Sequence, residues 1–481
     1  MMPMTRRNLV SGLAAGMLGL SGWPAVEAAS PQCRAIAPAP KQAAPVIEPP
    51  LGDLGRQKGV AIGVQLDVSY THDYGEGMYD AAYTQLVRAE KPDFVAFGSA
   101  FKFGNVAADA PSSDGLLAFS DTPSGVADTW YVARDLAAMT RAAGIGGRAD
   151  ALVWQDDQVI QPWLRKIAAG SAPDRRKNAD LDWNLTRMEA YIAAAIAKMY
   201  DLSAGDPAYF RSISLVNEPL DPFAAHGRVA YRGGSFAPPG LFLDTETKPA
   251  GYIADAFRTA EAVNRAIARE RGTSPLTAQL ILNETTLETD QFGPVMRPAL
   301  LKLLRQMQAE GLAIGGVGLE CHLQPQMMAD PFKPDWSAFG TFLDEVAGLG
   351  LDIHLTELDV IDYVTSCSGH KGSIEDSDRL VAHYFESFLA RALACPKLKS
   401  ITFWDLSDRY SFYRQLDVAS WYGYDHVRLP QALRSWPRCG EIPAKAEAIA
   451  CPRPAVYDDH FRPKPARAAI ARALVAAPPR G

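Results

Sequence analysis

The sequence predicts an α/β protein built as a single (β/α)8 TIM barrel. Short apolar runs rich in β-branched residues recur eight times along the 481 residues. Helical patterns lie between these runs, for example at 188–200 and 252–271, with apolar residues three and four positions apart. Strands that alternate with helices form a parallel sheet, and eight such units are the number that closes a barrel.

The N-terminus has the pattern of an export signal. Arg6 and Arg7 precede a short apolar stretch at 11–21, and 26–28 offers a small-x-small cleavage site. The stretch is shorter than the roughly 20 residues that span a bilayer. We therefore expect residues 1–28 to be removed and the product to be periplasmic or secreted. The paired arginines favour the twin-arginine route, and an ordinary Sec signal is the alternative.

A linker and one large domain follow the signal. Six prolines stand among the alanines of 29–58, which predicts an extended tether. The barrel domain is expected at 59–475, with a short tail at 476–481. The eight predicted strands are 60–66, 93–98, 145–154, 212–217, 279–283, 317–322, 352–357 and 400–404.

Three long segments rich in Pro and Gly account for the length beyond the roughly 250 residues of a typical barrel. They follow the fourth strand (219–251), the seventh (362–377) and the eighth (405–454). Each begins at the C-terminal end of a strand, which is the face where such barrels place their sites. We expect these loops to form the walls of a binding site for an extended ligand.

Composition and charge limit the classes of partner that we expect the protein to bind. The chain has 48 Lys and Arg against 55 Asp and Glu, a net charge of −7, and lacks a basic run that could track a phosphate backbone. Nucleic acid is therefore not an expected partner. Beyond the signal we find no segment long and apolar enough to span a membrane. We expect no cofactor, and a monomer.

The six cysteines are candidates for disulfides because the expected compartment is oxidising. Cys439 and Cys451 flank a short loop, and Cys367 and Cys395 flank a probable loop and helix, so these two pairs are preferred. Cys321 lies in an apolar run, where a buried inert thiol is commoner. Neither a Cys-x-x-Cys nor a His-Glu-x-x-His spacing occurs, so the sequence predicts no metal site.

Two carboxylates stand at the ends of predicted strands. Glu218 ends the fourth strand and Glu357 the seventh, 139 residues later. Two carboxyl groups that face each other about 5 Å apart can divide the acid and nucleophile roles in the cleavage of a glycosidic bond. Ordinary solvated carboxylates are the alternative.

The neighbouring motifs favour catalysis. Six blocks occur in strand order, at 152–154, 216–219, 316–323, 356–359, 403–412 and 457–466. Together they resemble glycoside hydrolase family 10, the retaining endo-β-1,4-xylanases and their relatives, from about residue 60 to 475. The resemblance implies a hydrolase of a β-linked polysaccharide or glycoconjugate that uses double displacement, and the N-terminal signal implies that it is exported.

The resemblance also implies individual roles. Glu218 would be the acid/base and Glu357 the nucleophile that forms a covalent glycosyl-enzyme. Asn217 would contact the sugar 2-hydroxyl, and His322 would orient Glu357. The expected substrate-binding positions are Lys102, Asp150, Trp154, Glu320, Trp404 and Phe412.

Several positions depart from the family pattern. Asp150 stands where the family has His, Glu320 where it has Gln, and Phe412 where it has Trp. Asp150 and Glu320 add carboxylates beside the catalytic pair, and crowded like charges raise a pKa unless a cation such as Lys102 or Arg148 pairs with them. We therefore expect a sugar other than plain xylose, such as a decorated glucan, a bacterial exopolysaccharide or a glycosylated plant metabolite.

Three alternatives stay open. The first is a conventional endo-β-1,4-xylanase, and the second, from a different class, is a non-catalytic carbohydrate-binding barrel. A nucleotide-dependent oxidoreductase is the third, because 144–149 matches Gly-x-Gly-x-x-Ala. These glycines follow a predicted helix and open a strand, which is the reverse of the dinucleotide-binding context.

Overall fold

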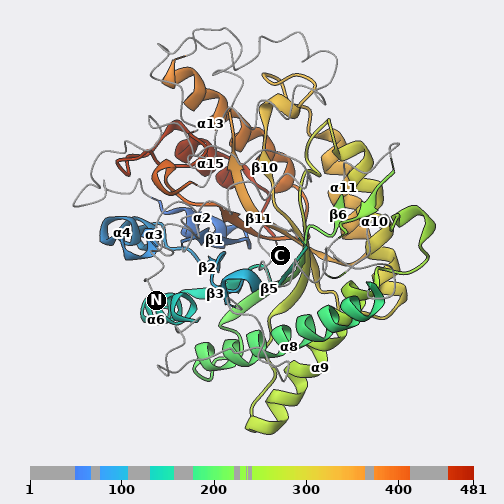
Figure 1. The fold of residues 1–481 in the computed structure, drawn as a ribbon. Coiled ribbons are helices and arrows are strands. Elements are labelled where there is room, and N and C mark those ends of the chain that lie inside the picture. Colours follow the sequence, from blue (N-terminus) through green and yellow to red (C-terminus); the bar gives the residue numbers. More distant parts are fainter. Residues whose placement is uncertain are drawn as a thin grey trace, which may run out of the picture.

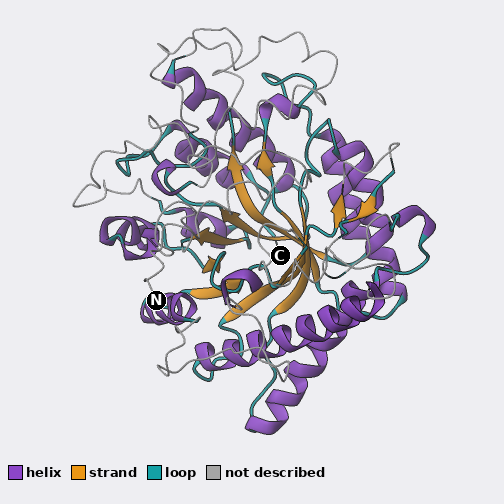
Figure 2. Cartoon of the chain, in the orientation of Figure 1, coloured by secondary structure: helices purple, strands orange, loops and turns teal. Residues whose placement is uncertain are grey.

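The computed structural model describes residues 49–66, 76–106, 130–155, 177–221, 228–233, 236, 241–362, 373–411 and 453–480. Within them, strands gather at the centre of the molecule and helices surround them (Figure 1; Figure 2). The predicted signal at 1–28 lies outside the described residues, as does Phe412.

The strands form a closed parallel barrel. Their bounds are β1 Ala61–Gln65, β2 Phe94–Phe97, β3 Gly146–Ala149 with β4 Val153–Trp154, β5 Phe210–Asn217, β8 Gln279–Glu284, β9 Gly316–Leu319 with β10 His322–Leu323, β11 Asp352–Val360 and β12 Leu398–Phe403. The pairing runs β1-β2-β3-β5-β8-β9-β11-β12, and β12 pairs with β1 to close the ring. The predicted TIM barrel is confirmed, and each predicted strand position holds a strand, with the third and sixth divided in two.

Helices cover the outside of the barrel. They are α2 Leu51–Gln57, α3 Glu76–Tyr79, α4 Ala81–Ala89, α5 Phe103–Val106, α6 Tyr131–Ala142, α8 Lys177–Ser203, α9 Gly251–Arg271, α10 Gly293–Ala309, α11 Ser337–Gly348, α13 Ile374–Ala392 and α15 Pro465–Ala476. Local side-chain and backbone features determine where several helices begin or end. Ser373 and Asp376 form a capping box at the start of α13, and Gly272 ends α9 at a φ of +63°. Among the described helices, none combines the length and the apolar character needed to cross a bilayer.

The folded unit starts before the predicted boundary. Leu51 and Leu54 of α2 are buried in the core, so the C-terminal end of the predicted linker at 29–58 is instead a helix of the barrel domain. Burial of these two apolar side chains offsets the conformational entropy that is lost when this short helix forms. At the other end, Lys58 Nζ donates to the carbonyl of Ala477 at 2.7 Å, which fastens the start of the predicted tail.

The cysteines depart in part from the prediction. Cys321 is a buried free thiol, as predicted. Cys395 is also a buried free thiol, and its Sγ lies 3.9 Å from the carbonyl oxygen of Leu343 in α11. The predicted pairing of Cys395 with Cys367 is therefore wrong for this structure, because Cys395 packs against a helix as a small apolar side chain. Three predicted disulfide partners, Cys367, Cys439 and Cys451, lie outside the described residues.

A buried ion pair joins the two ends of the domain and yields a stability prediction. Arg467 Nε of α15 donates to Glu90 Oε1 at 2.6 Å, and Leu51 N donates to Glu90 Oε2 at 2.7 Å. Glu90→Ala leaves a buried guanidinium without its partner, so we expect a loss of about 3–5 kcal/mol in the free energy of unfolding by urea. Glu386→Ala removes an exposed pair with Arg472 and should cost about 0–1 kcal/mol. Equal losses in the two variants would contradict the structural role of Glu90.

The segment after β5 is the described long loop nearest to the predicted acid/base. It carries a two-stranded antiparallel pair, β6 Leu220–Asp221 and β7 Ala230–Tyr231, in which Leu220 lies opposite Tyr231. The 3-10 turn η4 Leu243–Thr245 follows, and α9 begins at Gly251. The predicted loop at 219–251 is thus a loop built around a small hairpin.

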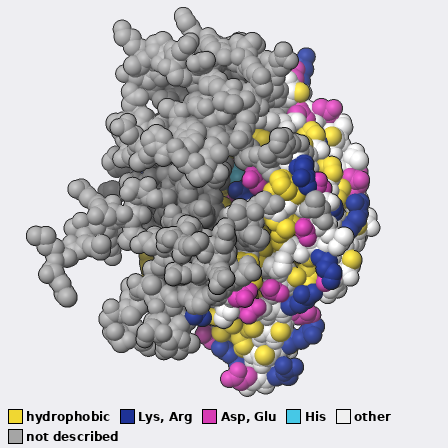
Figure 3. All heavy atoms as spheres, turned by 45° about the vertical axis from the view of Figure 1, so that its right-hand side comes forward, with side chains coloured by type: hydrophobic (Ala, Val, Ile, Leu, Met, Phe, Trp, Pro, Cys, Tyr) yellow, Lys and Arg dark blue, Asp and Glu magenta, His cyan; other side chains and the backbone are white. Residues whose placement is uncertain are grey.

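Surface charge is mixed on the face drawn in Figure 3. Acidic and basic side chains are interspersed over the described part of that face. Several acidic residues of the chain are instead buried at the C-terminal ends of the barrel strands, among them Glu218, Glu320 and Glu357. That end of the barrel holds the candidate site.

Candidate active site

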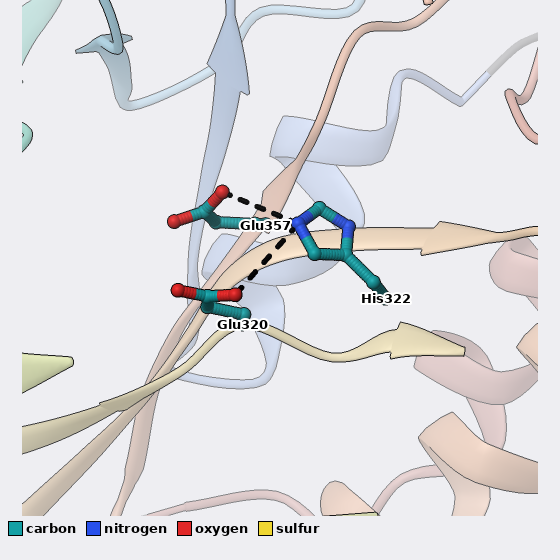
Figure 4. A group of neighbouring side chains, drawn as sticks. All are labelled: Glu320, His322 and Glu357. Atoms are coloured by element: carbon teal, nitrogen blue, oxygen red, sulfur yellow. Dashed lines mark ion pairs between the residues drawn. The ribbon is translucent and has the colours of Figure 1, made fainter. Parts of the chain in front are cut away.

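Glu357 lies on β11 and is held from two sides. Its Oε2 is 3.3 Å from His322 Nε2 (Figure 4), and its Oε1 accepts a hydrogen bond from Asn283 Nδ2 at 3.1 Å. Burial opposes the charged form, but the hydrogen bond and charge of His322 outweigh it and hold the pKa of Glu357 below its usual range. Glu357 is therefore an ionised carboxylate, which is the state that a nucleophile needs.

His322 is itself fixed by a second carboxylate. Its Nδ1 lies 2.9 Å from Asp359 Oδ1, while Nε2 faces Glu357. Burial disfavours an imidazolium, yet the charge of Asp359 and the contact with Glu357 raise the pKa of His322 well above its usual value. The pKa of Asp359 is raised to about 6 by burial, against the opposing charge of His322. The result is a cation between two carboxyl groups, with its orientation set by Asp359.

Glu218 follows β5 directly and is turned by an unusual backbone. Its φ is +42°, in the left-handed region that a non-glycine residue rarely adopts. Its backbone N–H donates to Asn283 O at 2.9 Å, and its Oε2 lies 2.6 Å from Arg232 Nη2. Cys321 and Asp405 also have positive φ just after a strand, at +59° and +68°. Such conformations gather at functional sites because the surrounding structure must hold them.

Asn283, at the end of β8, links the two predicted catalytic carboxylates. Its Nδ2 lies 2.7 Å from Asn217 Oδ1 and 3.1 Å from Glu357 Oε1, and its carbonyl accepts from Glu218 N. Gly318 on β9 leaves the room for this side chain, because a Cβ there would lie 2.1 Å from Asn283 Oδ1. Asn283 therefore contacts Asn217, Glu218 and Glu357 and holds the three residues together.

The two additional carboxyl groups are both buried beside the pair. Asp150 Oδ2 accepts from Arg148 Nη2 at 3.0 Å, and burial, opposed by Arg148, raises the pKa of Asp150 to about 6. Burial and the charges of Glu218 and Glu357 raise the pKa of Glu320 well above its usual range. The predicted crowding is therefore present. Arg148 pairs with Asp150, and its charge also lowers the pKa of Glu357.

The predicted aromatic and basic contacts lie around the same centre. Lys102 Nζ is 5.0 Å from the ring centroid of Trp154, a distance at which a cation interacts with an aromatic face. Trp154 lies in β4 opposite Asn217 of β5. The Trp404 ring lies edge-on to His322, with 6.2 Å between centroids. These residues line the predicted site, whereas Phe412 lies outside the described residues.

One group of described residues also offers metal-ligand atoms. Glu320, His322 and Glu357 each place one such atom within 4.8 Å of the others (Figure 4). His322 Nε2 is 4.0 Å from Glu320 Oε2, against 3.3 Å from Glu357 Oε2. The shorter contact is the one that keeps Glu357 ionised, so these side chains have a use in glycoside cleavage that requires no ion.

Sequence reasoning missed three residues of this network: Asp359, Asn283 and Arg232. Asp359 carried a usable signal, because it lies two residues after Glu357 on one strand and so lies on the same side of the sheet. Asn283 is the last residue of the predicted strand 279–283, and the six motif blocks do not include it. Arg232 lies in a long loop, and the pairing of β6 with β7 determines where it lies.

Asp359→Asn tests how Glu357 is kept ionised. The substitution removes the charge that stabilises the His322 imidazolium, so the pKa of His322 falls and Glu357 loses part of its counter-charge. The pKa of Glu357 then rises, because burial is less well opposed. We expect the acidic limb of the pH profile of kcat/KM on an aryl β-glycoside to move to higher pH by roughly one unit. An unchanged acidic limb would contradict this role of Asp359.

Comparison of the sequence with known proteins also points to a glycoside hydrolase. The sequence model of Glycosyl hydrolase family 10 matches residues 119–473. A thermostable celloxylanase of Thermoclostridium stercorarium is 26% identical over 294 residues, which are 59% of this chain and 65% of the relative. Endo-1,4-beta-xylanase A of Halalkalibacterium halodurans is 25% identical, covering 59% of this chain and 63% of the relative. The alignments thus span less than two thirds of these relatives.

Solved structures show the same fold. Native xylanase10C from Cellvibrio japonicus superimposes with a TM-score of 0.63 at 16% identity, over 92% of this chain and 76% of that one. Xylanase B from Clostridium stercorarium F9 gives a TM-score of 0.59 at 20% identity, over 88% and 99%. The family match covers well over half of the 481 residues, so the chain belongs to glycosyl hydrolase family 10.

Proposed function

We propose that this protein is an exported, retaining β-glycoside hydrolase with Glu357 as nucleophile and Glu218 as acid/base. The observation that carries the proposal is that Glu357 and Glu218 are each held in a fixed position by contacts with neighbouring residues. His322 keeps Glu357 ionised, and Asn283 joins Glu357 to the segment that turns Glu218 into the same site.

The geometry supports a double displacement. In the first step, a Glu357 oxygen attacks the anomeric carbon and forms an ester, while Glu218 gives its proton to the departing glycosidic oxygen. In the second step, Glu218 takes a proton from water, the water oxygen attacks the same carbon, and the Glu357 carboxylate leaves. Asn217, the last residue of β5, accepts a hydrogen bond from Asn283 Nδ2, and this fixed amide supports a contact of Asn217 with the sugar hydroxyl next to that carbon.

We propose a β-linked polysaccharide or glycoconjugate other than plain xylan as the substrate. Asp150 and Glu320 support this, because two buried carboxyl groups with raised pKa values stand at positions that the family resemblance assigns to sugar contacts. A protonated carboxyl group donates a hydrogen bond that a carboxylate cannot, and it therefore changes which hydroxyl pattern is accepted.

A panel of β-linked glycans tests the substrate. Xylan, mixed-linkage and substituted glucans, bacterial exopolysaccharides and plant glycosides are digested separately, and kcat/KM is measured from the reducing ends released. We expect a substrate other than unsubstituted xylan to give the highest value. The names of the relatives favour the second candidate, a conventional endo-β-1,4-xylanase. Xylan cleaved far faster than all other glycans would establish that candidate.

Export is part of the proposal and has its own test. The motif at 6–7 and the cleavage site at 26–28 support removal of the first 28 residues. Expression of the full chain in a bacterium, followed by cell fractionation and N-terminal sequencing, should give a periplasmic or secreted protein that begins after Ala28. A cytoplasmic protein with an intact N-terminus would contradict export.

A further inference from the structure

We infer that Arg232 is a positioning residue for Glu218, which holds the acid/base carboxylate in place and balances its charge. This inference rests on the function proposed above, because it assigns Arg232 a part in the proton transfers of Glu218. Arg232 Nη2 lies 2.6 Å from Glu218 Oε2, and both side chains are largely buried. A charge-assisted contact this short, away from bulk water, is among the stronger polar interactions in proteins.

The hairpin after β5 delivers Arg232 to this position. Leu220 of β6 lies opposite Tyr231 of β7, and Tyr231 is buried in the core. The next residue, Arg232, donates its backbone N–H to the carbonyl of Pro219 at 2.8 Å, which places it beside the residue that follows Glu218. Because β6 pairs with β7, the chain comes back at Arg232 to a position beside Glu218.

A second anchor fixes the hairpin to the barrel. Gln155 directly follows β4, and its Nε2 donates to the carbonyl of Arg232 at 2.9 Å. Its Oε1 accepts from the backbone N–H of Phe236 at 2.7 Å, so one buried amide binds the loop at both Arg232 and Phe236. Arg232 is thus tied to β4 through Gln155 and to the end of β5 through Pro219.

The charges around Glu218 explain why a cation is needed there. Together with burial, the charge of Glu218 raises the pKa of Glu284 in β8 and of Glu320 just after β9, and Glu357 from β11 lies beyond Asn283 with His322 as its own partner. Burial raises the pKa of Glu284 to about 8, and the Arg232 charge is the first effect that opposes this rise. Arg232 therefore supplies positive charge to a part of the site rich in carboxyl groups.

The ion pair affects both proton transfers in a defined direction. An adjacent cation favours the ionised form of a carboxyl group. Arg232 therefore stabilises the carboxylate that forms as Glu218 gives up its proton in the first step. Without Arg232, the carboxylate of Glu218 loses this counter-charge, so the acid form is favoured relative to the base form.

Three variants test the inference: Arg232→Gln, Arg232→Lys and the matched control Arg228→Gln. Arg228 lies in the same loop but pairs with Asp244 at the surface. The pH profile of kcat/KM is measured on 4-nitrophenyl β-glycosides, with thermal melting as the check on folding. We expect the basic limb of Arg232→Gln to move to higher pH by roughly one unit. Arg232→Lys should restore most of the wild-type profile, and Arg228→Gln should match the wild type.

The outcomes separate this inference from the proposed function. Wild-type turnover together with an unchanged basic limb in Arg232→Gln would overturn the role of Arg232 and leave the glycosidase function standing. A wild-type protein that neither hydrolyses the 4-nitrophenyl glycosides nor is labelled by a 2-deoxy-2-fluoro glycoside would overturn both. A basic limb that moves in Arg228→Gln as far as in Arg232→Gln would show a general effect of loop charge and would also overturn the specific role.

Discussion

Glu357→Gln is expected to lower kcat on the best β-glycoside substrate by at least about 10⁴-fold, because the amide cannot form the covalent glycosyl-enzyme. The shape of the side chain is kept, and an amide oxygen can still accept the hydrogen bond that Asn283 Nδ2 gives to Glu357 Oε1. The loss should therefore appear in kcat, whereas the Kd of the substrate measured by calorimetry should change only a few-fold.

The control for this variant is Glu386→Ala, which removes a carboxylate from an exposed ion pair remote from the site. It should leave kcat at the wild-type value. If Glu357→Gln binds the ligand and its turnover equals that of the wild type, the assignment as an enzyme is rejected. A non-catalytic carbohydrate-binding barrel is then favoured.

Glu218→Gln should have an effect that depends on the leaving group. A glycoside with a poor leaving group needs a proton on the departing oxygen, so we expect kcat/KM to fall by roughly 10²–10⁴-fold. A 2,4-dinitrophenyl glycoside needs no such proton, and its first step should keep a rate close to that of the wild type. The glycosyl-enzyme should then accumulate, because water lacks its base in the second step.

Added azide gives the second measurement for Glu218→Gln. Azide attacks without a general base, so it should restore turnover of the dinitrophenyl glycoside and yield a glycosyl azide of the same anomeric configuration as the substrate. An equal loss on both leaving groups, with no response to azide, would contradict the assignment of Glu218.

Strand periodicity sufficed to predict the barrel, because eight apolar runs alternate with helical patterns and each run became a strand. The same placement predicts that Glu218 and Glu357 lie at one end of the barrel, since parallel strands end at a common face. In the structure both residues contact Asn283. The short helix α2 was missed, because it begins directly after Pro49 and Pro50 and so resembles the end of a tether.

The supporting network required the structure. Arg232 reaches Glu218 only through the pairing of β6 with β7, which depends on tertiary packing of Tyr231 and on the amide of Gln155. Asn283 on β8 contacts Asn217 of β5 and Glu357 of β11, and strand register rather than motif spacing determines that meeting. Asp150 likewise depends on its contact with Arg148, whose guanidinium also donates to the carbonyl of Thr356 at 2.9 Å.

The stereochemistry of the first product tests the assignment of Glu357 as nucleophile most directly. Proton NMR of a digest of the best β-glycoside, recorded in the first minutes before mutarotation, reports the anomer that the enzyme releases. Two displacements at one carbon, first by Glu357 and then by water, predict a β-anomer as the fresh product. An α-anomer as the first product would mean a single displacement by water, and Glu357 would then not be a nucleophile.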